Sequence, residues 1–162
     1  MSRFGAAMMI VLGTAGVASA DFAAPRYVPE RSSMAVRAAN LVTAAAKAEM
    51  IGNASEGLRL ADAAIKADPD DGWGYYDRGE ALQALGQTDG AISAYREAEK
   101  HFPNEVWSKS IPLYGEANAL AVAGRCDEAR VAFERYASFV ESADPRSAEL
   151  GRRYAKDCRA RS

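Results

Sequence analysis

The sequence predicts an all-α fold, a solenoid of stacked antiparallel helix pairs that ends in a capping helix. Beyond residue 33 the chain consists of alanine-rich stretches with helical apolar periodicity, separated by Gly, Asp and Pro, and no stretch alternates as a strand does. Identical markers also recur 34 residues apart, a period typical of helical repeats. The marker pairs are Gly52 and Gly86, Ala64 and Ala98, and Pro69 and Pro103.

Residues 1–20, MSRFGAAMMIVLGTAGVASA, have the three parts of a secretory signal peptide. Arg3 precedes an apolar run, and the small residues Ala18 and Ala20 come just before the expected cleavage site after Ala20. The alternative is an uncleaved anchor, but the run of about 14 apolar residues is shorter than the ~20 residues that span a bilayer. We therefore expect a periplasmic or secreted protein whose mature chain does not insert into the membrane.

Residues 21–33, DFAAPRYVPERSS, are predicted to be a flexible leader because they contain two prolines and paired serines without apolar periodicity. The remaining residues, 34–162, are enough for one domain with a hydrophobic core. The formal net charge is −2 at pH 7, and the sequence has no basic patch. This composition argues against a nucleic-acid partner.

The segment 73–103, WGYYDRGEALQALGQTDGAISAYREAEKHFP, contains the most complete repeat. It has an aromatic residue before a glycine, an apolar residue one turn later, a turn glycine, and a small–aromatic–small pattern before proline. These markers are Tyr75, Gly79, Leu82, Gly86, Ala91, Tyr95, Ala98 and Pro103. The pattern resembles the tetratricopeptide repeat, although Arg78 stands where that family usually has Leu.

The resemblance implies a right-handed solenoid of about three and a half repeats. The predicted repeats cover about 38–71, 72–105 and 110–143, a four-residue insertion falls near 107–110, and a capping helix covers 145–160. Small residues such as Gly79 and Ala91 are expected where helices cross closely. Large residues, including Tyr95 and Tyr154, are expected to fill the space between the helices.

The two cysteines, Cys126 and Cys158, allow four interpretations. Cys126 aligns with Thr88 at the start of a second helix and Cys158 with Gly124 at the end of a first helix, so stacked pairs bring the sulfurs close. A metal site lacks further ligands in a chain with one histidine, and a redox pair would favour Cys-x-x-Cys. In an exported protein we expect a disulfide that pins the last helix, with two unpaired buried thiols as the alternative.

The sequence contains no catalytic motif of the Gly-x-Ser-x-Gly, His-Glu-x-x-His or Gly-Lys-Ser/Thr type. Its one histidine, His101, lies at a predicted helix C-terminus, where a cation suits the helix dipole. The acidic run 68–71, DPDD, matches a turn between repeats. We therefore expect no enzyme, no metal and no cofactor. The alternative from the enzyme class is a hydrolase whose site is built from dispersed carboxylates.

The resemblance implies that the first helix of each pair lines a concave face, which receives an extended peptide or a partner's helix. Helical spacing independently gathers polar and aromatic residues into stripes on these helices. Tyr and Trp contribute binding energy when a partner buries them, but Trp73 and Tyr76 could equally complete the internal packing. Glu49 and Glu80 disfavour acidic peptides. The predicted partner-binding residues are Trp73, Tyr76, Glu80, Gln83, Tyr114, Asn118 and Arg152.

These observations lead to one main hypothesis and one alternative. The main hypothesis is a non-catalytic protein–protein interaction module of the bacterial cell envelope, with a protein or peptide partner and a monomeric state favoured. The alternative is a structural subunit that self-associates or docks permanently through Trp107, the insertion and the ends of the array.

Overall fold

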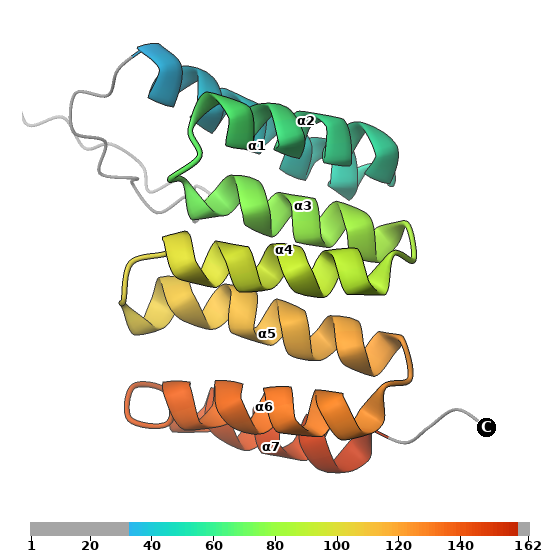
Figure 1. The fold of residues 1–162 in the computed structure, drawn as a ribbon. Coiled ribbons are helices and arrows are strands. Elements are labelled where there is room, and N and C mark those ends of the chain that lie inside the picture. The colour runs from blue at the N-terminus through green and yellow to red at the C-terminus, as the bar shows by residue number, and fades with distance from the viewer. Residues whose placement is uncertain (1–32, 159–162) are drawn as a thin grey trace, which may run out of the picture.

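The computed structural model describes residues 33–158, which form seven helices (Figure 1). The predicted signal peptide and all of the predicted leader except Ser33 lie outside the described residues. Within residues 33–158 there is no strand. The helices are α1 (Ser33–Met50), α2 (Ala54–Ala67), α3 (Gly72–Ala84), α4 (Thr88–His101), α5 (Val106–Val122), α6 (Cys126–Val140) and α7 (Pro145–Asp157).

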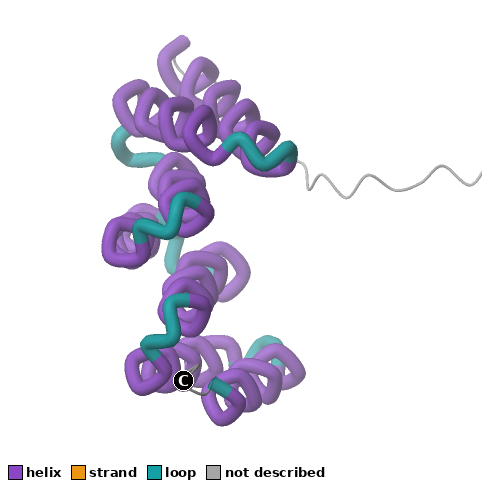
Figure 2. The backbone as a smooth tube through the Cα atoms, turned by 90° about the vertical axis from the view of Figure 1, so that its right-hand side faces the viewer, coloured by secondary structure: helices purple, strands orange, loops and turns teal. Residues whose placement is uncertain are grey.

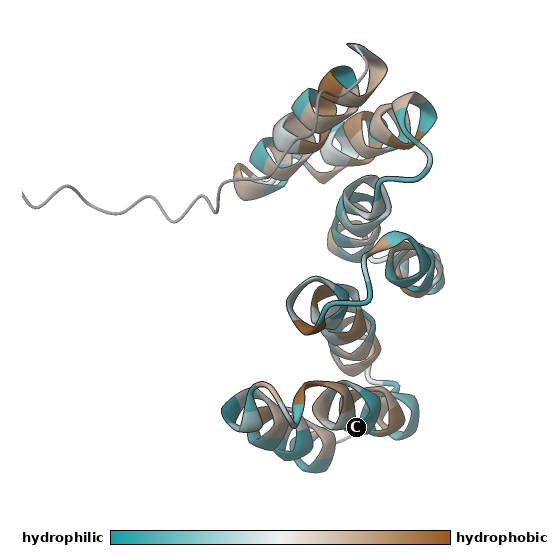
Figure 3. Ribbon diagram, turned by 90° about the vertical axis from the view of Figure 1, so that its left-hand side faces the viewer, coloured by the Kyte–Doolittle hydropathy of each residue, from teal (hydrophilic) through white to brown (hydrophobic). Residues whose placement is uncertain are grey.

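The helices stack as antiparallel pairs, α1 with α2, α3 with α4, and α5 with α6, while α7 packs on α6. Views along the helices show the odd-numbered helices on one side of the column and the even-numbered helices on the other (Figure 2, Figure 3). The first and last helices project furthest on the odd-numbered side, which is therefore the concave face. The predicted fold class, an all-α solenoid of helix pairs, is confirmed.

The first helix of each pair ends at a glycine in the left-handed conformation. Gly52, Gly86 and Gly124 have φ angles of 78°, 73° and 75°, a region that favours glycine because it has no Cβ. After Gly52, the backbone N–H of Asn53 donates to the carbonyl of Ala48, five residues back, which is the 6→1 bond of the Schellman motif. The same bond recurs in the next two pairs, so one turn geometry sets the stacking of all three.

Tyr95 occupies the joint between the second and third pairs. The side chain is fully buried, and a Cβ added at Gly79 or Gly115 would lie 2.6 or 2.8 Å from its ring. The ring is thus held between the backbones of α3 and α5, where only glycine leaves room. The predictions that Gly79 is small at a crossing and that Tyr95 fills the core are confirmed.

Tyr154 was predicted to fill the core, and this prediction was wrong. The residue is 38% exposed because α7 is the last described helix and no further helix covers it. Its ring centroid still lies 5.5 Å from that of Phe133, so one side of the ring packs and the other faces outward.

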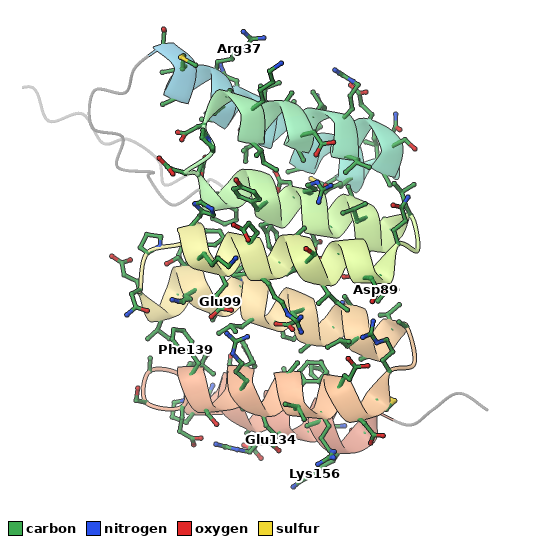
Figure 4. The ribbon with its side chains drawn as sticks, in the orientation of Figure 1. Arg37, Asp89, Glu99, Glu134, Phe139 and Lys156 are labelled. Carbon is green, nitrogen blue, oxygen red and sulfur yellow. A yellow bond between two sulfur atoms is a disulfide. The ribbon has the colours of Figure 1, made fainter. Side chains whose placement is uncertain are left out.

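Ion pairs join the helices on the side opposite the concave face. Glu116 of α5 is only 4% exposed and pairs with Arg96 of α4 and Arg135 of α6. Arg135 also binds Glu99, and both Glu99 and Asp89 lie on the α4 surface drawn in Figure 4. A buried carboxylate without a cation costs free energy. The two arginines therefore stabilise the charge of Glu116 and link α4, α5 and α6.

The insertion before the third pair lengthens its first helix. The helix α5 has 17 residues, whereas α3 has 13. Trp107 lies in the added turn and is 66% exposed. Among residues 33–158, none of the helices combines the length and the apolar character that a bilayer crossing requires.

Candidate functional site

Two grooves open between neighbouring odd-numbered helices. The N-terminal groove, between α1 and α3, has a volume of about 680 Å³. The C-terminal groove, where α5 faces α6 and α7, has a volume of about 370 Å³. The N-terminal groove is lined by Val42, Thr43, Ala46, Lys47, Glu49, Met50, Trp73, Tyr76, Asp77 and Glu80. The C-terminal groove is lined by Tyr114, Asn118, Ala121, Phe133, Tyr154, Asp157 and Cys158.

Trp73 and Tyr76 form the aromatic wall of the N-terminal groove. Their rings meet edge to face with centroids 5.9 Å apart, and Trp73 also contacts Phe102 edge to face at 5.0 Å. Both side chains are half-buried. The two interpretations left open by the sequence therefore both hold in part, because each ring packs internally and still presents a surface to the groove.

Acidic side chains also line the N-terminal groove. Glu49, Asp77 and Glu80 all line it, and Asp77 is only 4% exposed. Burial, followed by repulsion from Glu80, raises the pKa of Glu49 to about 7. Burial also raises the pKa of Tyr76, and the three carboxylates raise it further. Negative charge is therefore concentrated around one tyrosine.

The internal repeat explains why Glu49 lacks a hydrogen-bond donor. In the second pair, the Tyr95 hydroxyl donates to Glu80 at 2.5 Å and to Gln83 at 3.1 Å. Glu49 lies 34 residues before Gln83, but the residue 34 before Tyr95 is Ala61, which has no hydroxyl. The Oε1 atom of Glu49 is buried and has no hydrogen-bond partner within residues 33–158. The shorter Ala61 side chain leaves this carboxylate unsatisfied.

The C-terminal groove is aromatic and closed by a covalent bond. The Tyr114 ring lies 5.5 Å from Tyr136 and 6.4 Å from Tyr154 by ring centroids. Burial raises the pKa of Tyr114, with a smaller contribution from Tyr154. Cys126 and Cys158, the pair predicted from the repeat, form a disulfide with their Cα atoms 5.3 Å apart. The bond ties the end of α7 to the start of α6.

The structure divides the predicted partner-binding residues among three places. The N-terminal groove contains Trp73, Tyr76 and Glu80, and the C-terminal groove contains Tyr114 and Asn118. The other two residues line neither groove. The side-chain oxygen of Gln83 accepts a hydrogen bond from the Tyr95 hydroxyl, and Arg152 forms an ion pair with Glu141.

The placement of α7 explains why Arg152 does not line the C-terminal groove. Counting by the repeat puts Arg152 beside Asn118, but the backbone of α7 packs on α6 and does not contact that of α5. The residues of α7 that line the groove are Tyr154, Asp157 and Cys158. The register of α7 therefore departs from that of the earlier first helices.

Sequence reasoning also missed Asp77 in the N-terminal groove. This carboxylate lies four residues after the predicted stripe residue Trp73, so the same helical spacing could have found it. Among residues 33–158 there is no group of three His, Cys, Asp or Glu side chains that could hold a metal ion.

Residues 60–93, from α2 into α4, match the tetratricopeptide repeat family. The fold of the chain is also similar to two solved tetratricopeptide-repeat (TPR) structures from yeast. None of the curated proteins matches the sequence.

The first similar structure is the TPR2B-domain:pHsp70 complex of yeast Sti1, with a TM-score of 0.65 and 18% identity over 76% of this chain and 99% of that chain. The second is the TPR2AB-domain:pHSP90 complex of yeast Sti1, with a TM-score of 0.64 and 17% identity. The match covers 75% of this chain but only 47% of the second structure, about half of its length. Both likenesses show that the helices adopt the TPR fold.

Proposed function

We propose that this protein is a non-catalytic interaction module that holds a peptide segment or a partner's helix in its concave face. The observation that carries the proposal is that both grooves open on that face, and each presents aromatic rings that are only partly covered. Such rings contribute binding energy when a partner completes their burial. The similar TPR domains of Sti1 are themselves in complexes named for pHsp70 and pHSP90, which supports a peptide partner here.

The test is crosslinking of the purified protein to a cell-envelope extract, with a Trp73→Ala, Tyr114→Ala double variant beside the wild type. These substitutions remove one aromatic wall from each groove, so partners captured by the wild type should be lost or strongly reduced. Val131→Ala is the control, since it shortens an exposed apolar side chain of α6 that lines neither groove. Equal capture by the double variant would move the interface away from the concave face.

The proposed location is the periplasm of a bacterial cell envelope, where the protein acts as an adaptor or assembly factor. The signal-like residues 1–20 support export, and a disulfide suits the oxidising compartment that an exported chain enters. Expression of the full chain in a Gram-negative host tests this location. We expect periplasmic protein whose measured mass begins at Asp21, whereas an unprocessed cytoplasmic chain would contradict it.

A second candidate function is a structural subunit of an envelope assembly. The observation that favours it is Trp107, which is largely exposed and whose ring centroid lies 6.4 Å from that of Trp73, beside the N-terminal groove. Size-exclusion chromatography with light scattering separates the two candidates. A monomer supports the adaptor, and an oligomer that persists on dilution supports the structural subunit.

A further inference from the structure

The N-terminal groove has an excess of negative charge on an otherwise aromatic and apolar lining. Among residues 33–158, the carboxylates of Glu49 and Glu80 line it beside Asp77, and the one cation in this part of the lining is Lys47. Lys47 is exposed, whereas Glu49 and Glu80 are half-buried. A partner that enters this groove therefore meets a net negative surface at close range.

Several carboxylates elsewhere in residues 33–158 have cationic partners, including the most deeply buried glutamate among them, Glu116. Glu116 pairs with two arginines, and Arg59 and Arg78 bind Glu56 and Asp62 respectively. In the groove the situation differs, because no ion pair joins Glu49 or Glu80 to a cation anywhere in residues 33–158. The described chain leaves these two charges for something outside it to neutralise.

The groove also has the surfaces that a long cationic side chain requires. Trp73 and Tyr76 can present ring faces to an ammonium or guanidinium group, which aromatic rings attract through their electron-rich faces. Ala46 and Met50 supply apolar surface for the methylene stem of such a side chain. The same Trp73 borders a smaller hollow with Asp68, Asp70 and Asp71, so the acidic surface continues past the groove.

We propose that the N-terminal groove receives an arginine or lysine side chain from the bound segment, held between the aromatic wall and the carboxylates of Glu49 and Glu80. This inference rests on the proposed function, since it specifies the chemistry of a partner segment in the same face. The partner is thus a protein segment in which a basic residue stands among apolar ones, and acidic segments are disfavoured.

Binding of a cation is coupled to the ionisation of Glu49. The titratable and charged groups around Glu49 are Lys47 on its own helix, Tyr76, Asp77 and Glu80 on α3, and Tyr95 on α4, while Gly57 of α2 packs against its side chain. With a pKa of about 7, Glu49 is about half protonated at neutral pH, and an entering cation favours the ionised form. The affinity for a basic segment should therefore rise as the pH increases from about 6 to 8.

The experiment uses the mature, oxidised protein and three blocked pentapeptides, acetyl-Leu-Ala-Xaa-Ala-Leu-amide, in which Xaa is arginine, citrulline or glutamate. Citrulline has the shape of arginine without its charge, so the first pair isolates the contribution of charge. We expect the arginine peptide to bind about tenfold more tightly than the citrulline peptide, and the glutamate peptide to bind least. Titration calorimetry gives the affinities, and the indole shift of Trp73 in NMR spectra reports the site.

A variant with Glu49→Gln and Glu80→Gln keeps the side-chain shapes and leaves an oxygen to accept the Tyr95 hydroxyl. It should bind the arginine and citrulline peptides with affinities within about twofold of each other. The matched control is Asp157→Asn, which removes a carboxylate from the C-terminal groove and should keep the tenfold preference. The melting temperature of each variant verifies that the fold persists.

The outcomes separate this inference from the proposed function. Equal wild-type affinity for the arginine and citrulline peptides would overturn the basic side chain but leave the concave face as a peptide site. A preference for arginine that survives in the double glutamine variant would place the cation elsewhere and also overturn the inference. Both proposals fail if no peptide binds, whether the protein is a monomer or an oligomer in light scattering.

Discussion

The two grooves of the concave face share one backbone plan and differ in how they are closed. Each opens beside the first helix of a pair, and each of these first helices ends in the same glycine turn. The N-terminal groove is the larger, at about 680 Å³ against about 370 Å³, and carboxylates line it. The C-terminal groove is filled by the rings around Tyr114 and fastened by the disulfide.

One position of the repeat accounts for much of this difference. Position 95 and its equivalents hold Ala61, Tyr95 and Phe133 in the three pairs. Tyr95 fills its joint and donates to Glu80, Phe133 packs against Tyr114 without a hydroxyl, and Ala61 leaves a carboxylate unsatisfied. The stacking thus tolerates a change of size at this position, and the residue there sets the chemistry of the adjacent groove.

The largest expected effect comes from breaking the joint between the grooves. Gly79→Leu would drive its side chain into the Tyr95 ring, which Gly115 confines from the other side. We expect a loss of more than about 3 kcal/mol of unfolding free energy, or no folded protein. Ala84→Leu is the matched control, because Ala84 lies on the same helix and is exposed. Similar melting temperatures for the two variants in circular dichroism would refute the packing of this joint.

The second effect should be confined to the C-terminal groove. Cys126→Ala with Cys158→Ala removes a cross-link between residues 32 apart, which is worth about 3 to 4 kcal/mol in the chain-entropy model. Hydrogen exchange should show faster exchange throughout α7, because the disulfide ties its end to α6 and its backbone contacts no helix other than α6. The amides of α1 and α3 should be unaffected at temperatures where the array remains folded. Unchanged protection of α7 would mean that its packing alone holds it.

The sequence was informative wherever the structure repeats. The 34-residue spacing of Gly52 and Gly86 marked the turns, and the same count brought Cys126 beside Cys158, because stacked pairs repeat their neighbours. These features depend on the backbone arrangement, which each pair copies from the one before. They could therefore be derived without knowledge of the side-chain packing.

The sequence was less informative where the repeat ends or changes. Arg152 and Tyr154 both depart from their expected places, and the backbone of α7 packs on α6 and not on α5. The unsatisfied oxygen of Glu49 depends on the absence of a hydroxyl at Ala61, a contact between two different helices. Such pairings depend on three-dimensional neighbours that periodicity does not reveal.

A smaller effect concerns the charge of the N-terminal groove. The pKa of Glu49 is raised from 4.5 to about 7, so the folded state holds a proton that the unfolded state releases. The stability linked to this proton is present in full below about pH 4.5 and is lost as the pH rises through about 7. Glu49→Gln should therefore be more stable than the wild type at pH 8, by about 1 kcal/mol after allowance for solvent screening.

Urea unfolding of the wild type and Glu49→Gln at pH 5 and pH 8 measures this difference. The gain should be clear at pH 8 and small at pH 5, where the wild-type carboxyl is already protonated. Equal gains at both pH values would mean that Glu49 is not destabilised by its charge.

The smallest expected effect is that of Trp107→Ala, at the edge of the N-terminal groove. The side chain is 66% exposed and lies in the turn that lengthens α5, so its removal should change the unfolding free energy by only about 0.5 kcal/mol. In an adaptor, the variant and the wild type should both be monomers in light scattering. In a structural subunit, Trp107 would be buried between copies, and the variant should dissociate. An oligomer that Trp107→Ala disrupts would therefore favour the structural subunit and show that the N-terminal groove extends into a subunit interface.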